Sequence, residues 1–274
     1  MATTVIPRVR RPAVSGYYYP EDPQVLRQVL DQLVSRAEDQ LAARAVIVPH
    51  GSLRQSGSVA GAVFGCVRVP RRCVVLGAAH TDSAARWSLF ARGSFLTPLG
   101  LVDLDEGFCD TLLESCPFLE VDASGQRGEH AVEVVLPFLQ HARPEGCVVT
   151  PVLTTSVKPE ELSSFAQALE RAIRALDEPV LLVASSDLSH YEPTDAGTEQ
   201  DRRLLDAIMA LDAPALCRLA ESGVRMCGVG AVASVLLAAS RLGAVRGELI
   251  SYGTSLASGG DPASGIGYGG VVIR

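Results

Sequence analysis

"VLLVASSDLSH", residues 180–190, is the segment that most directly predicts the fold. An apolar run leads straight into two serines and Asp187, and His190 follows three positions after the aspartate. Short unbroken apolar runs of this kind are typical of strands that are buried on both faces of a parallel sheet. The polar residues that end the run are therefore expected at the carboxyl edge of the sheet, where α/β proteins bind their ligands.

Two other apolar runs end in the same way. "RAVIVP" (44–49) is followed by His50, and "RCVVLGAAH" (72–80) closes on His80. One histidine after a strand is usually structural, but three of the chain's five histidines follow predicted strand ends. If these strands are parallel, His50, His80 and His190 meet with Asp187 at one edge of the sheet.

Helical and strand patterns alternate along the rest of the chain, and no low-complexity linker divides it. This alternation predicts one α/β domain, residues 1–274, with a mixed and largely parallel sheet and helices on both faces. We expect Asp22 to cap the first helix, Gly61 and Gly65 to allow close helix packing, and Pro137 to kink a helix. The predicted helices cover 24–37, 58–67, 106–116, 129–142, 158–176, 198–212, 213–222 and 229–243, and the other strands 86–97, 146–154, 247–256 and 267–274, with a Gly/Ser loop at 257–267.

Composition and charge exclude several classes of protein. Apolar residues make up 47% of the 274 residues and charged residues 20%, as in a globular protein with a well-filled core. The net charge of −7 argues against a nucleic-acid-binding protein, which would present a basic surface. No apolar run is long enough to cross a bilayer, so we expect no membrane association. The N-terminal segment lacks the continuous apolar stretch of a secretory signal.

The seven cysteines are scattered and odd in number, with no C-x-x-C pair. Two of them, Cys73 and Cys147, lie in apolar runs, where cysteine behaves as a small hydrophobic residue. This usage indicates a reducing cytoplasm rather than a disulfide framework.

Cys227 stands apart from the other cysteines because it directly precedes a predicted buried helix. Gly228 and Gly230 would let the backbone approach closely there, and a thiol at a helix N-terminus is expected to have a lowered pKa. Two imidazoles and one thiolate suit Zn, Fe or Cu. Asp187 and His190 would then complete the metal shell, orient a ligand or act as acid and base. The other interpretation is a buried structural cysteine beside a strand end and its cap.

Seven segments, in order and spacing, resemble the Memo family, whose bacterial and archaeal members are called AmmeMemoRadiSam system protein B. The segments are "IVPHG", "SGSVAGAVF", "VVLGAAH", "GEHAVEVVLPFL", "ASSDLSHY", "MCG" and "GYGGVVI", and "RRPAVSGYYYP" near the N-terminus also resembles the family's opening. The resemblance extends from about Arg10 to the C-terminus. It implies a fold similar to that of class III extradiol (LigB-type) dioxygenases, which are non-haem iron enzymes.

The resemblance also implies a site. Its metal ligands would be His50, His80 and Cys227, and its catalytic residues would be His190 and Asp187. Glu129 and His130 would lie behind the ligands or serve as acid–base groups. The alternative is that Glu129 only marks a helix start, where the helix dipole favours an acidic residue. The neighbours of the ligands depart from the family pattern, with "PHGSL", "GAAHT" and "CGVGA" in place of its usual residues.

These residues support three hypotheses about function. The first is a metal-dependent oxidoreductase of unknown substrate that uses Fe(II) or Cu. The second is a metal-free hydrolase or transferase with Cys227 as nucleophile, since "VASSDL" lacks the G-x-S-x-G elbow of serine hydrolases. The third is a non-catalytic binding protein that keeps the fold, because similar folds carry different functions. The expected partner is accordingly a small molecule or a protein.

Overall fold

The computed structural model describes residues 9–81, 84–192, 194–261, 263 and 265–274, and its centre is a four-stranded parallel sheet. The strands are ordered β8–β3–β9–β2, so the segment quoted above forms a central strand between two neighbours. Their bounds are β2 Ala45–Val48, β3 Arg72–Ala78, β8 Val148–Thr154 and β9 Val180–Ser185. All four strands point the same way, as predicted.

Shorter or antiparallel strands extend this core into a mixed twelve-stranded sheet. Beyond β2, β12 runs antiparallel and pairs with both β11 and β10. Beyond β8 lie β6, β5 and β1, while β4 pairs with the second half of β8 and with β7. The bounds are β1 Val9–Arg10, β4 Trp87–Leu89, β5 Ser94–Thr97, β6 Gly100–Leu104, β7 Glu120–Val121, β10 His190–Glu192, β11 Gly247–Thr254 and β12 Gly265–Ile273.

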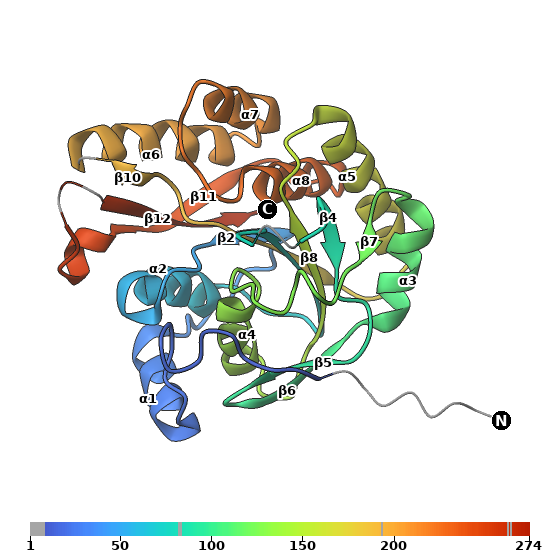
Figure 1. Cartoon of the computed structure of the whole chain (residues 1–274), viewed down its shortest axis with the longest axis horizontal. Helices are drawn as coiled ribbons and strands as arrows, with labels where there is room; N and C mark the ends of the chain where they lie inside the picture. Colours follow the sequence, from blue (N-terminus) through green and yellow to red (C-terminus); the bar gives the residue numbers. More distant parts are fainter. Residues whose placement is uncertain (1–8, 82–83, 193, 262, 264) are drawn as a thin grey trace.

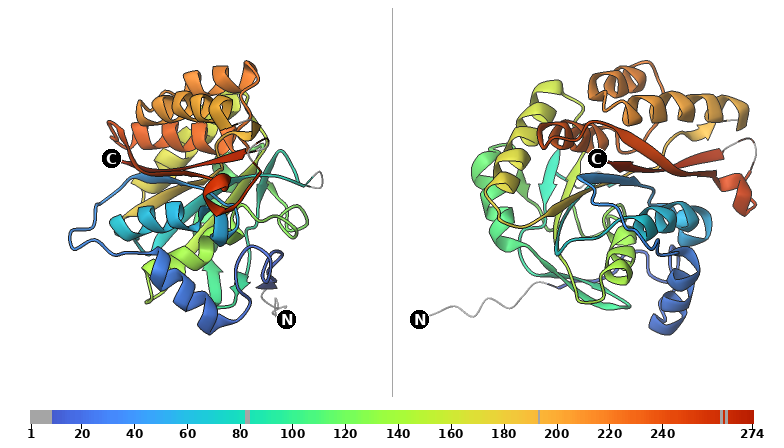
Figure 2. Two further views of the ribbon diagram at one scale, coloured as in Figure 1. Left: turned by 90° about the vertical axis from the view of Figure 1, so that its left-hand side faces the viewer. Right: turned by 180° about the vertical axis from the view of Figure 1, so that it is seen from behind.

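Helices cover both faces of the sheet, which confirms the predicted fold class (Figure 1; Figure 2). On one face lie α1 Pro23–Leu33, α2 Leu53–Cys66 and α4 Leu136–Ala142. On the other lie α3 Glu106–Ser115, α5 Pro159–Arg174, α6 Thr194–Met209, α7 Ala213–Glu221 and α8 Val229–Arg241. Among the described residues, no helix is both long and apolar enough to span a bilayer.

The alternation of side chains along each central strand divides the core into two layers. In β9, Leu181 and Val183 pack against the α1–α2–α4 layer, and Leu182 and Ala184 pack against the layer on the opposite face. Both sets are fully buried, because successive side chains of a strand point to opposite faces. Cys73 belongs to the first layer, as its apolar context predicted, and none of the seven cysteines forms a disulfide.

The strand predicted over 86–97 is wrong, because two separate strands, β4 and β5, occupy the range. Gly93 has φ +104°, a conformation that an L side chain rarely adopts, and it lies in the turn between them. Alternating polarity is present in both strands, so periodicity alone did not reveal the turn.

The helix predicted over 129–142 is also wrong in extent. A 3₁₀ turn, η1 Glu133–Val135, precedes α4, which begins only at Leu136. Pro137 therefore lies in the first turn of α4, where its missing N–H costs nothing, and it causes no kink. Before the turn, the backbone amides of His130 and Ala131 donate hydrogen bonds to a buried carboxylate, which is described below.

An ion pair between Arg10 and Glu133 anchors the N-terminal segment. Both side chains are buried, and the Tyr19 hydroxyl and the Ala13 and Val14 amides also donate to the Glu133 carboxylate. Part of the predicted domain, residues 1–8, and two positions of the predicted Gly/Ser loop, 262 and 264, lie outside the described residues.

Close helix packing at Gly61 and Gly65 is confirmed. A Cβ added at Gly61 would lie 2.2 Å from the Leu33 carbonyl oxygen, and one at Gly65 would lie 2.3 Å from that of Ser35. Asp22 also caps α1 as predicted, since its carboxylate accepts hydrogen bonds from the Gln24 and Val25 amides.

We expect Gly61→Ala to lower the free energy of unfolding by about 1–3 kcal/mol, because backbone must shift to admit the methyl group. Gly107 is the matched control: it lies in α3 with nothing within 4 Å of an added Cβ. Gly107→Ala should raise the free energy by about 0.5–1 kcal/mol through helix propensity. Urea unfolding of both variants checks this, and equal effects would refute the packing at Gly61.

Candidate metal centre

Three parallel strands deliver polar residues to one edge of the sheet at matching positions. His50, His80 and Asp187 each lie two residues beyond the last residue of β2, β3 and β9, respectively. Val48 of β2 and Gly77 of β3 both pair with Ser185 of β9, so β2 and β9 end level and β3 ends one residue later. This pairing of β2 and β3 with β9 explains why the polar residues after the three strands lie at one edge, as predicted.

Three imidazoles form the tightest cluster at this edge. One ligand atom from each of His50, His80 and His130 lies within 4.8 Å of those of the other two, and the ring centroids are 4.5–5.2 Å apart. His50 is buried, His130 is partly buried and His80 is exposed, so the cluster runs from the interior to the surface. His130, which sequence reasoning set behind the ligands, is thus part of the cluster itself.

A chain of hydrogen bonds fixes the orientation of His50. The Ser185 hydroxyl donates its single proton to the Ala131 carbonyl oxygen at 2.5 Å. It must therefore accept from His50 Nδ1, which lies 2.9 Å away. This assignment leaves Nε2 of His50 unprotonated and available to a metal ion.

Glu129 orients His80 in the same manner. Its buried carboxylate accepts hydrogen bonds from His80 Nδ1 at 2.8 Å and from the backbone amides of His80, His130 and Ala131. Burial alone would raise the pKa of Glu129, but hydrogen bonds from the His130 and His80 side chains outweigh it and hold that pKa well below its usual range. A carboxylate behind a histidine is the usual partner of a metal-ligating imidazole.

Cys227 contacts one member of the histidine cluster. Its Sγ lies 3.4 Å from His50 Nε2 and accepts a hydrogen bond from the Asp187 amide at 3.3 Å. It lies next to Gly228, the N-cap of α8, and Gly228 leaves no room for a Cβ beside Ser186, as predicted. Cys227 is not part of the tight three-atom cluster, which contains His130 in its place.

The predicted lowering of the Cys227 pKa is wrong for the metal-free site. Burial, followed by the negative charge of Asp187, raises the pKa of Cys227 to about 12. Burial likewise lowers the pKa of His50 to about 4, although Asp187 opposes that shift. Without a cation the site thus favours a neutral thiol and a neutral imidazole, because burial disfavours charge on either group.

Asp187 links the strand ends to His190. Its Oδ1 accepts hydrogen bonds from the His50 amide at 2.9 Å and the Gly51 amide at 3.3 Å. Its Oδ2 lies 3.9 Å from His190 Nε2, while His190 Nδ1 donates to the Leu188 carbonyl oxygen at 3.0 Å. His190 therefore carries its proton on Nδ1 and presents Nε2 as the basic atom.

A cavity of about 380 Å³ adjoins the site, and both His190 and Cys227 line it. Most of its other walls are apolar, with Val157, Val224 and Val229 among them, and Arg225 contributes the one basic lining residue besides His190. The volume lies within the range of pockets that hold small molecules.

Two tyrosines that sequence reasoning missed also belong to the site. The ring of Tyr18 lies 5.0 Å from that of His130. Tyr268 of β12 is fully buried beside Gly51, and its hydroxyl has no hydrogen-bond partner among the described residues. Burial, then the charge of Asp187, raises its pKa above the usual range, so the hydroxyl stays protonated and can donate. In the sequence, the "GYGG" that contains Tyr268 indicated only a glycine-rich strand and gave no sign of a site residue.

One family model and its relatives match nearly the whole chain. A family model described as "Memo-like protein" matches residues 10–272. A MEMO1 family protein of Methanopyrus kandleri is 32% identical over 97% of this chain and 99% of its own, and one of Aquifex aeolicus is 30% identical over 97% and 99%. An uncharacterized Escherichia coli protein of known structure has a TM-score of 0.49 at 16% identity, covering 82% of this chain and 98% of its own.

The low pKa of His50 predicts a pH-dependent stability of the metal-free protein. Its unfolded pKa is near 6.5 and its folded pKa is about 4, so between these values the unfolded chain binds more protons. The free energy of unfolding should therefore fall by about 3 kcal/mol as the pH drops from 6.5 to 4.

The check is urea unfolding of chelator-treated protein against the His50→Gln variant at the same pH values. The stability difference between parent and variant should shrink across this window, since the variant lacks the titrating group. A difference that does not change with pH would contradict a buried neutral His50.

The unpartnered Tyr268 hydroxyl predicts that Tyr268→Phe leaves the free energy of unfolding unchanged or raises it, because no hydrogen bond is lost. Tyr19→Phe is the matched control and should cost about 1.5–3 kcal/mol, since it removes a donor from the buried Glu133 carboxylate. Denaturant unfolding measures both, and an equal loss would mean that Tyr268 has a partner within the fold.

Proposed function

Because the chain belongs to the Memo family, we propose that it is a metal-binding protein with His50, His80 and Cys227 as ligands and His130 beside them. The observation that carries this proposal is the cluster of three imidazoles, whose ligand atoms lie within 4.8 Å of one another. Partners behind His50 and His80 support it, because Ser185 and Glu129 hold the Nδ1 proton of each ring and leave Nε2 unprotonated.

The donor set fits a borderline-soft transition metal. Imidazole nitrogen suits Fe, Cu and Zn, and a thiolate adds preference for the softer ions, so we propose Fe(II) or Cu as the native metal. Such an ion supplies one-electron chemistry and polarises a bound substrate when it is present. The proposed activity is accordingly that of a metal-dependent oxidoreductase with an organic substrate in the adjoining cavity.

His190 and Asp187 are the proposed acid–base pair. Nε2 of His190 can take a proton from a substrate in the cavity, since Nδ1 is held by the Leu188 carbonyl oxygen. Asp187 Oδ2, 3.9 Å away, stabilises the imidazolium that results.

The other two hypotheses fare differently. A metal-free enzyme with Cys227 as nucleophile needs a thiolate, and a pKa of about 12 leaves almost none at neutral pH. A binding protein without catalysis would keep the fold and the family resemblance but would not need an ordered set of free imidazole nitrogens. That arrangement favours the metal centre over the binding protein.

Metal analysis of protein purified without chelator tests the proposal. The parent should carry close to one equivalent of transition metal, whereas His80→Ala and Cys227→Ala should each lose most of it. His141→Ala is the control, because His141 lies in α4, outside the cluster, and should keep the metal.

Two results would contradict the proposal. Parent protein that binds no Fe, Cu or Zn, even after reconstitution, would favour the non-catalytic binding protein. His80→Ala and Cys227→Ala variants that retain as much metal as the parent would place the metal elsewhere.

A further inference from the structure

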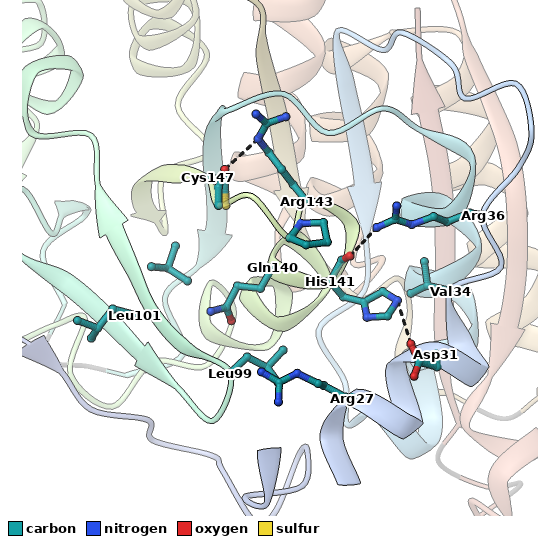
Figure 3. Close-up of a pocket in the computed structure, with 13 residues that line it drawn as sticks. Arg27, Asp31, Val34, Arg36, Leu99, Leu101, Gln140, His141, Arg143 and Cys147 are labelled. Atoms are coloured by element: carbon teal, nitrogen blue, oxygen red, sulfur yellow. Dashed lines mark hydrogen bonds and ion pairs between the residues drawn. The ribbon is translucent and has the colours of Figure 1, made fainter. Parts of the chain in front are cut away.

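A second cavity, of about 690 Å³, lies at the opposite end of the sheet (Figure 3). Gly146 and Cys147, which directly precede β8, contribute to its wall, whereas the histidine cluster follows the last residues of the parallel strands. A seven-residue strand is about 20 Å long, so the cavity is remote from the metal centre. The remaining walls come from α1, the β5–β6 turn and the end of α4.

Positive charge predominates among the residues that line this cavity. The lining includes three arginines, Arg27, Arg36 and Arg143, but only one carboxylate, that of Asp31. His141 lies 3.7 Å from Asp31, but burial lowers the pKa of His141 and keeps it mainly neutral. The whole chain carries a net charge of −7, so this basic lining is a local feature rather than a reflection of composition.

Backbone carbonyl oxygens hold two of the arginines in place. Arg36 donates to the His141 and Ala142 carbonyl oxygens at 2.8 and 3.1 Å, and Arg143 Nε donates to that of Gly146 at 2.9 Å. Figure 3 shows both guanidinium groups directed at the carbonyl oxygens that they donate to. The carbonyl oxygens orient the Arg36 guanidinium without neutralising its charge, whereas Glu145 forms an ion pair with Arg143 at 3.4 Å. Arg27 has no hydrogen bond or ion pair with any described residue.

The wall across from these charges is apolar. Leu99, Leu101 and Val102 line it, and Leu101 is 57% exposed, whereas Val34 lies on the side of Arg36 (Figure 3). The amide of Gln140 is held by Thr97 and the Gly100 carbonyl oxygen, which fixes the floor between the two walls. A cavity with fixed guanidinium groups on one side and exposed leucine on the other matches a ligand that is itself amphipathic.

We propose that this cavity binds a small organic anion, with a carboxylate or phosphate group at Arg27 or Arg36 and an apolar part against Leu99 and Leu101. Guanidinium groups bind both kinds of anion with paired hydrogen bonds. The site is separate from the metal centre and does not depend on whether the metal is bound.

Calorimetric titration of the full chain with phenyl phosphate and with benzoate tests this. Arg27→Gln should weaken binding of the tighter probe about tenfold, the value of one charge-assisted hydrogen bond. Arg203→Gln is the matched control, because Arg203 is exposed on α6, on the other face of the sheet, and should bind as the parent does. Leu101→Ala should weaken phenyl phosphate but leave inorganic phosphate unchanged.

His80→Ala separates this site from the metal centre and should bind the probes as the parent does. The proposal is overturned if neither probe binds the parent, if Arg27→Gln binds as tightly as Arg203→Gln, or if His80→Ala abolishes binding. The last result would mean that the anions bind at the metal centre instead.

Discussion

The hydrogen bonds made by the Glu129 carboxylate are the constraint on which the rest of the site depends. A buried carboxylate is costly unless it is well supplied with donors, and Glu129 receives them from His80, His130 and Ala131. The same carboxylate thus sets the position of two imidazoles and of Ala131, whose carbonyl oxygen accepts a hydrogen bond from Ser185. Through Ser185 it also bears on His50, so all three rings are positioned by one connected network.

This network explains a local irregularity of the fold. Residues 129–132 have helical composition, yet regular helix begins only at Leu136, after a 3₁₀ turn. Before the turn, the His130 and Ala131 amides donate hydrogen bonds to the Glu129 carboxylate. Glu133, at the start of the turn, is in turn held by Arg10 and Tyr19, so the N-terminal segment braces the same stretch from outside. Local helix propensity has yielded here to the requirement that buried carboxylates be paired.

The predictability of each feature follows from the range of the interaction that determines it. The central strands and the meeting of His50, His80 and Asp187 were predictable, because apolar runs identify buried strands and parallel strands share one carboxyl edge. His130 was placed behind the ligands rather than among them, since its position depends on Glu129 rather than on a strand end. Ser185 and Tyr268 carry no local signal, because each acts through a residue far away in the sequence.

Burial and the dipole of α8 have opposite effects on the pKa of Cys227, and the effect of burial is the larger. A helix N-terminus is worth about 0.3–1 kcal/mol to a negative charge, whereas a rise in pKa from 9 to about 12 corresponds to about 4 kcal/mol against the thiolate. The thiol is thus a poor nucleophile by itself, and only a stronger positive charge than the dipole can ionise it. A bound transition metal would supply that charge, so metal binding at this site would release the Cys227 proton and be favoured by higher pH.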